Sequence, residues 1–170
     1  MISFEDILNN LPDGSLRPKY KERDFAIPEK ILKDIREDSW TQKFQICRVS
    51  SVPESYKDYK KECIIDLSMV VGTFKGEFED GDVNLKTVYK KNAHKMGTID
   101  NYDSKENFKA FLISDFSGGL PQVVECNGEY YIDGDGNHRL MLAKLLKISE
   151  AKVIVQTLTE EGEKFLRKEL

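Results

Sequence analysis

Cysteine is scarce in this chain of 170 residues: Cys47, Cys63 and Cys126 are widely separated, and no Cys-x-x-Cys pair occurs. Because the cysteines are few, odd in number and far apart, the sequence predicts reduced thiols in a cytoplasmic protein rather than a disulfide framework or a redox pair. The two histidines, His94 and His138, do not combine with any cysteine at the spacing of a zinc site. A zinc centre is therefore not predicted.

Long apolar runs and a basic leader are also missing. No stretch of about 18 apolar residues occurs, so we expect no membrane-spanning segment. Residues 1–6 are acidic and lack the basic start and apolar run of a secretory signal peptide. Both absences favour the cytoplasm as the location of the protein.

Neither sign of charge dominates the composition, which has 26 basic and 30 acidic residues and a net charge of −4. An acidic total argues against a protein dedicated to coating DNA, since duplex binding draws its affinity from the neutralisation of phosphates. A local basic patch remains possible. The most basic stretch contains Lys86, Lys90, Lys91, His94 and Lys95, with Tyr89 beside them. It has two interpretations, a solvated surface or a contact with nucleic acid or nucleotide phosphates.

The length and the order of helix and strand signals predict a single α+β domain with a small mixed sheet. An N-terminal helical arm is expected over residues 1–40, the main domain over 41–158, and a C-terminal helix over 159–170. In the main domain, alternation and turn signals predict strands over 44–49, 122–126, 130–132 and 152–156. Asn127-Gly128 is predicted as the hairpin turn. Ser104 is predicted to cap a helix that ends near residue 113.

Residues 50–103 are the least clear part of the sequence. The apolar run over 63–71 fits a strand or a short buried helix, and its periodicity does not decide between them. Further along the chain, the apolar residues from Phe74 to Tyr89 are expected to form a hairpin with Asp80-Gly81 as its turn.

The most informative pattern lies at residues 130–146. An apolar strand leads into Asp133-Gly134-Asp135-Gly136, and Asn137-His138-Arg139 then opens a strongly apolar helix. The N–H groups at a helix N-terminus attract an anion, and glycines let the backbone approach a phosphate closely. The pattern therefore predicts a phosphate-binding turn.

The charged side chains of this turn have several interpretations. Arg139 suits a phosphate because its guanidinium makes bidentate hydrogen bonds, and a salt bridge to one of the aspartates is the alternative. His138 could act as a general acid or base, donate to a phosphate, or brace the turn. Asp133 and Asp135 would repel a phosphate unless Mg²⁺ intervenes. Each is therefore a candidate metal ligand or catalytic base, and the alternative is a role in stabilising the turn.

Residues 108–155 resemble the ParB/sulfiredoxin-like fold. Members of that group share a helix, a Leu-Pro-x-x-Val strand, a short Asn-Gly-type hairpin, an Asp-Gly-x-His-Arg turn, a Leu/Ala-rich helix and an apolar strand. The corresponding segments here are 108–112, 120–124, 127–128, 136–139, 142–146 and 153–155. On this resemblance, the strand over 44–49 opens the fold, and residues 50–103 are an enlarged insert.

The resemblance implies a nucleotide site. In this group the turn and the helix after it hold the phosphates of ATP or CTP. Members use the nucleotide for sulfinic-acid repair, for phosphorylation of free serine or for gating a DNA clamp. Carried over by position, the candidates for holding phosphates are Gly134, Gly136, Asn137, His138 and Arg139. The resemblance thus implies nucleotide binding with Mg²⁺-dependent phosphoryl transfer or nucleotide hydrolysis, as in a kinase or NTPase.

Several departures from the group's pattern limit what carries over. Sulfiredoxins have a reactive cysteine immediately before His-Arg, where this chain has Asn137, so thiol-based repair is not expected. ParB partition proteins continue into a helix-turn-helix DNA reader, and the sequence after residue 155 is too short for one. Lys147 stands where a glycine often closes the helix. Two alternatives to a kinase or NTPase stay open: a DNA-associated or nuclease-like ParB-type protein, and a non-catalytic phage or mobile-element protein that acts by binding a partner protein.

Overall fold

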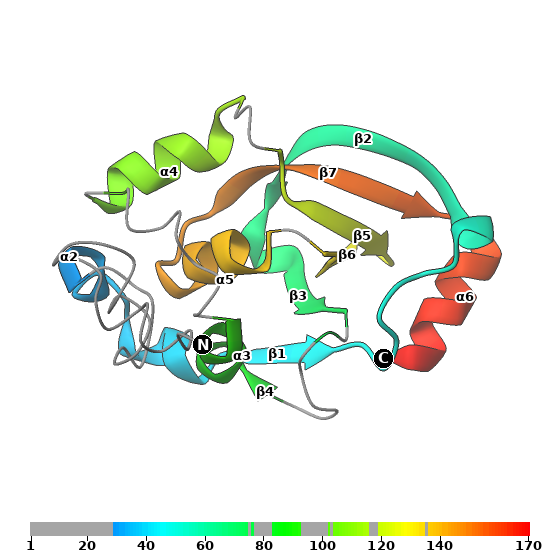
Figure 1. Cartoon of the computed structure of the whole chain (residues 1–170), viewed down its shortest axis with the longest axis horizontal. Coiled ribbons are helices and arrows are strands. Elements are labelled where there is room, and N and C mark those ends of the chain that lie inside the picture. The colour runs from blue at the N-terminus through cyan, green and yellow to red at the C-terminus, as the bar shows by residue number, and fades with distance from the viewer. Residues whose placement is uncertain are drawn as a thin grey trace, which may run out of the picture.

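The computed structural model of the chain describes residues 29–74, 76, 83–92, 102, 104–115, 119–134 and 136–170. In these residues, seven strands form one mixed sheet in the order β2-β7-β5-β6-β3-β1-β4 (Figure 1). The strands are β1 (Lys43–Ile46), β2 (Lys57–Asp66), β3 (Val70–Thr73), β4 (Val83–Asn84), β5 (Gln122–Cys126), β6 (Glu129–Ile132) and β7 (Glu150–Leu158). The expected α+β class with a mixed sheet is confirmed.

Helices and short 3₁₀ turns connect and cover these strands. The α-helices are α2 (Glu29–Leu32), α3 (Leu85–Asn92), α4 (Lys105–Ile113), α5 (Asn137–Leu145) and α6 (Glu160–Glu169). The 3₁₀ turns are η1 (Glu37–Thr41), η2 (Glu54–Tyr56) and η3 (Leu67–Met69). None of the described helices has the length and apolarity needed to cross a membrane.

A hairpin forms the middle of the sheet. β5 and β6 pair antiparallel through the predicted turn, where Asn127 has φ 55° and Gly128 has φ 77°. These positive φ values at both central residues are those that a tight hairpin turn needs. β7 lies parallel to β5, and β3 lies parallel to β6. β2 pairs antiparallel with β7 at one edge, while β1 and β4 complete the other side.

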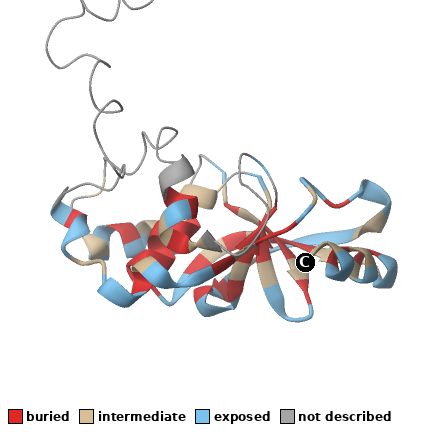
Figure 2. Cartoon of the chain, turned by 90° about the horizontal axis from the view of Figure 1, so that it is seen from below, coloured by how far each residue is buried: buried red, intermediate tan, exposed pale blue. Residues whose placement is uncertain are grey.

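The sheet separates two hydrophobic cores, because successive strand residues point to opposite faces. Val123 and Ile132 belong to the larger core, which also contains the apolar residues of α5. Their neighbours Val124 and Tyr131 belong to the smaller core with Leu166 of α6. Buried positions accordingly concentrate on the strands and on the helix surfaces that face them (Figure 2).

Helix α5 is the central helix of the larger core. Its residues from Leu140 to Leu145 are all buried, including Lys144, which is the pattern of a helix surrounded by protein on all sides. Helix α3 packs against it. The two ends of α5 are therefore held by different parts of the structure, and each end presents a different set of polar groups.

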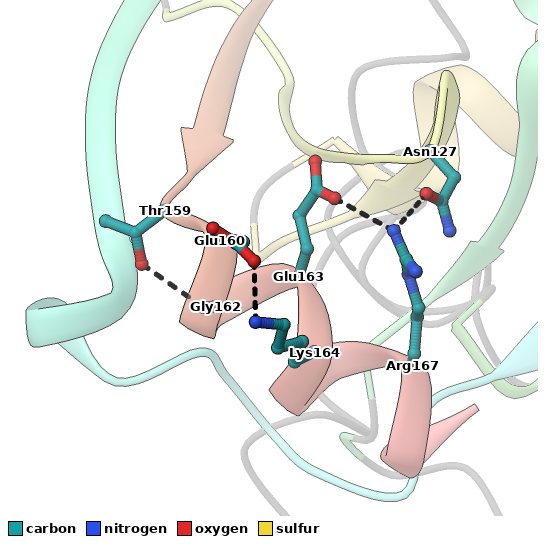
Figure 3. Close-up of polar contacts among 7 residues, drawn as sticks. All are labelled: Asn127, Thr159, Glu160, Gly162, Glu163, Lys164 and Arg167. Atoms are coloured by element: carbon teal, nitrogen blue, oxygen red, sulfur yellow. Dashed lines mark hydrogen bonds and ion pairs between the residues drawn. The ribbon is translucent and has the colours of Figure 1, made fainter.

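Helix α6 covers the opposite face and is anchored by polar contacts at both ends (Figure 3). Thr159 caps it by accepting a hydrogen bond from Gly162 N–H at 3.2 Å. Near its C-terminus, Arg167 donates to the side chain of Asn127 in the hairpin turn and pairs with Glu163 at 3.0 Å. The expected C-terminal helix is therefore present and is tied to the β5–β6 turn.

The expected hairpin between Phe74 and Tyr89 is wrong for its second half. Residues from Leu85 onward form α3, and Leu85, Val88 and Tyr89 are buried on one face of it. Their spacing of three and four residues is helical, and Asn84 caps the helix by accepting from Thr87 N–H at 2.8 Å. The proposed turn at Asp80-Gly81 lies outside the described residues.

The segment over 50–103, expected as an insert, contributes two long-range strands to the sheet. β2 pairs with β7 along most of its length, and β3 lies between β6 and β1. The apolar run over 63–71 proves to be the end of β2, the turn η3 and the start of β3. Of the expected N-terminal arm, residues 1–28 lie outside the described part, whereas Ile31 of α2 is buried in the larger core.

Candidate functional site

The predicted phosphate-binding turn connects β6 to α5. Asp133 N–H donates to Gln122 O at 2.9 Å, which continues the hairpin pairing one residue beyond β6. Gly134 and Gly136 have φ values of 69° and 113°, which favour glycine over other residues. Asp135, the other candidate metal ligand or base, lies outside the described residues.

Gly136 is the N-cap of α5, and no side chain there accepts from the first-turn amides. A Cβ atom at this position would lie 2.5 Å from Pro121 Cβ and 2.9 Å from Pro121 Cα. Two features therefore favour glycine at position 136: the positive φ and the close approach of Pro121. This contact gives a physical reason why a Leu-Pro strand start and a Gly-x-His-Arg turn occur together in one sequence.

Asn137 braces the turn from inside. Its Oδ1 accepts from Thr73 Oγ1 at 2.7 Å, and its Nδ2 donates to Gly134 O at 3.2 Å. Thr73 is fully buried at the end of β3, and its hydroxyl also lies 3.1 Å from Ile132 O. The sequence pattern did not single out Thr73, because its role arises from the parallel pairing of β3 with β6.

Arg139 lies at the junction between α5 and the segment before β5. Its Nη1 donates to Gly119 O at 2.9 Å, and its guanidinium carbon is 5.7 Å from the centre of the Phe111 ring. The ring of Tyr102 packs against Phe111. Burial raises the pKa of Tyr102, and the positive charge of Arg139 partly opposes this rise. Arg139 thus has an aromatic and backbone support that orients it.

His138 is half-buried at the second position of α5, and its Nε2 atom is enclosed by the protein. Of the three roles predicted for this residue, bracing of the turn matches an enclosed nitrogen most directly. The roles in proton transfer and phosphate binding stay predictions.

Asp133 is half-buried, and desolvation raises the pKa of its carboxyl group. The positive charges of Lys57 and Lys60 oppose this rise, whereas the negative charge of Glu54 adds to it. Tyr131 faces the smaller core and Ile132 the larger one, so alternation places Asp133 on the side away from α5.

The neighbourhood of Asp133 agrees with that orientation. Lys60 Nζ lies 3.5 Å from Gln122 Oε1, and Gln122 precedes Val123, a residue of the larger core. The structure therefore does not bring the Asp133 carboxylate to the face of the sheet that carries α5.

Further metal-binding side chains do not surround the predicted metal site in the described residues. In the described part of the chain, no group of three or more His, Cys, Asp or Glu side chains could hold a metal ion. The pair of Asp133 and Asp135 stays a prediction, because Asp135 lies outside that part.

The basic stretch after β4 is only partly described. Lys86 Nζ lies 5.1 Å from the centre of the Trp40 ring. Tyr89, expected beside the basic residues as a possible contact for nucleic acid, is instead fully buried in the larger core. The side chains of Lys90 and Lys91, together with His94 and Lys95, lie outside the described part.

The three cysteines are free thiols: Cys47 and Cys126 are buried and Cys63 is half-buried. Burial raises the pKa of the Cys47 thiol to about 12, which disfavours the reactive thiolate. Comparison of the chain with protein-family models, curated proteins and solved structures found no match.

Proposed function

We propose that this protein binds the phosphates of a nucleoside triphosphate or diphosphate at the turn over residues 134–139. The observation that carries the proposal is the N-terminus of α5. Its N-cap is a glycine that provides no side-chain acceptor, so the first-turn amides can donate to an anion. The close contact of Gly136 with Pro121 leaves no room for a side chain at the N-cap.

The fixed position of the turn supports the proposal. Asn137 bonds to Thr73 of β3 and to Gly134 O, which ties the start of α5 to the sheet. A preorganised set of donors binds an anion better than a mobile set, because less conformational entropy is lost on binding.

Arg139 is the proposed cationic partner of the phosphates. Its guanidinium has five N–H donors, and one of its nitrogens donates to Gly119 O. Stacking near Phe111 limits its rotamers. We propose that this guanidinium donates to phosphate oxygens when a nucleotide binds, since charge-assisted bonds from arginine are among the stronger ones in proteins.

The resemblance suggests ATP or CTP as the nucleotide and a Mg²⁺-dependent transfer or hydrolysis of its phosphate. Asp133 faces away from α5, so we do not assign it to the metal. Asp135 is then the candidate metal ligand or base within the turn, and His138 supports the turn. Catalysis is the second step of the proposal, and binding is tested before it.

The test is calorimetric titration of the purified chain with ATP, CTP, GTP and ADP, each with and without Mg²⁺. We expect saturable binding of at least one nucleotide. Arg139→Gln should weaken it at least tenfold, because a charge-assisted hydrogen bond is lost. Arg167→Gln is the matched control, since Arg167 lies on α6 at the other face of the sheet. Absence of binding for all four nucleotides overturns the proposal, as does equal weakening by both variants.

A further inference from the structure

A pocket of about 310 Å³ lies at the other end of α5. Its walls include Asp66 and Ser68 around η3, and Lys144, Lys147 and Ser149 at the end of α5 and just after it. The volume is that of a site for a small molecule. Gly136 and Lys144 are eight residues apart on one helix, so the pocket is about 12 Å along the axis from the phosphate-binding turn.

Lys144 is the buried charge of this pocket. Only 6% of the residue is exposed, and its Nζ donates to Leu67 O at 2.8 Å. An ammonium group has three N–H donors, and a single neutral carbonyl satisfies one of them. A buried charge with incomplete hydrogen bonding is costly, so this arrangement calls for a further acceptor.

The acidic groups near the pocket are engaged elsewhere. Asp66 Oδ1 accepts from Ser68 N–H at 2.8 Å, and this carboxylate is exposed. Its negative charge partly opposes the lowering of the Lys144 pKa by burial. Asp38, outside the pocket wall, pairs with Lys147. The two remaining N–H donors of Lys144 are thus the strongest unfilled polar feature of the pocket.

We propose that this pocket binds a small molecule carrying a carboxylate or phosphate group, whose oxygens accept from Lys144 Nζ. The hydroxyl groups of Ser68 and Ser149 are further donors in the wall. Burial lowers the pKa of Lys144 to about 8, and an anion beside the amine reverses part of this effect by stabilising the charged form.

The experiment is a titration followed by ¹H–¹⁵N NMR at constant ionic strength, with sodium acetate, sodium succinate and inorganic phosphate as separate probes. The acetate and succinate arms report on carboxylates, and the phosphate arm reports on phosphate esters. We expect saturable shifts of the amides over 66–68 and 147–149 with at least one probe.

Substitutions test whether Lys144 holds the bound anion. Lys144→Met, which keeps an unbranched side chain, should weaken binding at least tenfold. Lys147→Met is the matched control at the rim, because this lysine is exposed and already pairs with Asp38; we expect less than a threefold change. Asp66→Asn keeps an acceptor for Ser68 N–H and removes a negative charge, so it should tighten binding several-fold at about pH 6, where Lys144 stays protonated.

Three results would overturn the proposal. The first is the absence of saturable shifts at these amides with all the probes, which indicates that water alone completes the bonding of Lys144. The second is unchanged binding by a folded Lys144→Met. The third, which holds even if that variant does not fold, is a failure of Asp66→Asn to tighten binding. Phosphate shifts confined to residues 134–139 would also count against the pocket, while they would support the proposed nucleotide site.

Discussion

The two ends of α5 solve opposite electrostatic problems. At the N-terminus the polar groups belong to the backbone: the N-cap is a glycine without a side-chain acceptor, and Pro121 and Thr73 contact the turn. At the other end a charged side chain, Lys144, is buried against one carbonyl oxygen. The N-terminal end costs little free energy, because its amide dipoles can interact with either water or an anion. The second end carries the penalty of a buried ion.

The two ends of α5 therefore differ in what determines their stability. The turn depends on backbone shape, so it should respond most to changes in glycine. The pocket depends on a proton, so it should respond most to pH.

Gly136→Ala should give the largest loss of stability. The new Cβ would lie 2.5 Å from Pro121 Cβ, and φ is 113°. Overpacking and backbone strain together should cost about 4 kcal/mol of the free energy of unfolding. Urea denaturation measures this loss.

Gly134→Ala is the control for that change. Its φ is 69°, but no atom lies within 4 Å of the added Cβ, so only the left-handed conformation is penalised, by about 1 kcal/mol. Equal costs at the two positions would show that the contact with Pro121 does not constrain the turn.

Lys144 should make stability depend on alkaline pH. Its pKa falls from 10.5 to about 8 on folding. Below pH 8 both states are protonated, and the folded state bears the full cost of the buried charge. Between pH 8 and 10.5 the folded state loses its proton first. Stability therefore rises with pH in that window and stays at the gained level above it.

The expected gain, relative to Lys144→Met measured at each pH, is about 3 kcal/mol over the whole window. Chemical denaturation at several pH values between 7 and 11 (roughly the window plus one unit on the acid side) gives the difference. A constant difference between the two proteins would mean that Lys144 is solvated in the folded state.

Thr73 and Asn137 should be energetically coupled across the sheet. Thr73→Val removes the hydroxyl that donates to Asn137 Oδ1, and we expect a loss of about 1–2 kcal/mol because buried acceptors are left unsatisfied. Asn137→Ala removes the partner. In a double-mutant cycle, a coupling of about 1 kcal/mol is expected. Additive effects would contradict the view that β3 positions the turn.

The parts of the fold that local chemistry determines could be predicted from sequence. Asn127-Gly128 and the Ser104 cap depend on residues next to each other, and both are present as expected. By contrast, Thr73 bonds to Asn137 across 64 positions of the sequence, and Lys144 bonds to Leu67 across 77 positions. No periodicity or turn signal specifies such pairs. The hairpin expectation was wrong because Leu85, Val88 and Tyr89 follow the spacing of a helix. In so short an apolar run, periodicity separates a helix from a strand only weakly.

The orientation of Asp133 shows the same limit within the candidate site. Its position beside the glycines was evident in the sequence, but the face on which its carboxylate lies depends on strand alternation after Ile132 and on Lys57 and Lys60 of β2. A shift of one residue in the strand boundary would have reversed that face. Proximity in sequence to this glycine turn therefore does not place a carboxylate in the candidate site.

Lys147→Gly should have the smallest effect, and it should be stabilising. Lys147 follows α5 with φ 52°, a conformation in which glycine is favoured over lysine by about 1 kcal/mol. The change also removes the ion pair with Asp38, in which both side chains are exposed, so little stability is lost with it. The net gain should be about 0.5 kcal/mol in urea denaturation, reduced further at low salt, where the lost pair matters more.

Asn127→Gly, at a similar φ of 55°, is the control and should gain less, because asparagine already tolerates this conformation and its side chain accepts from Arg167. A loss of stability for Lys147→Gly would show that the ion pair outweighs the strain, so that this end of α5 is held by charge at its surface as well as in its pocket.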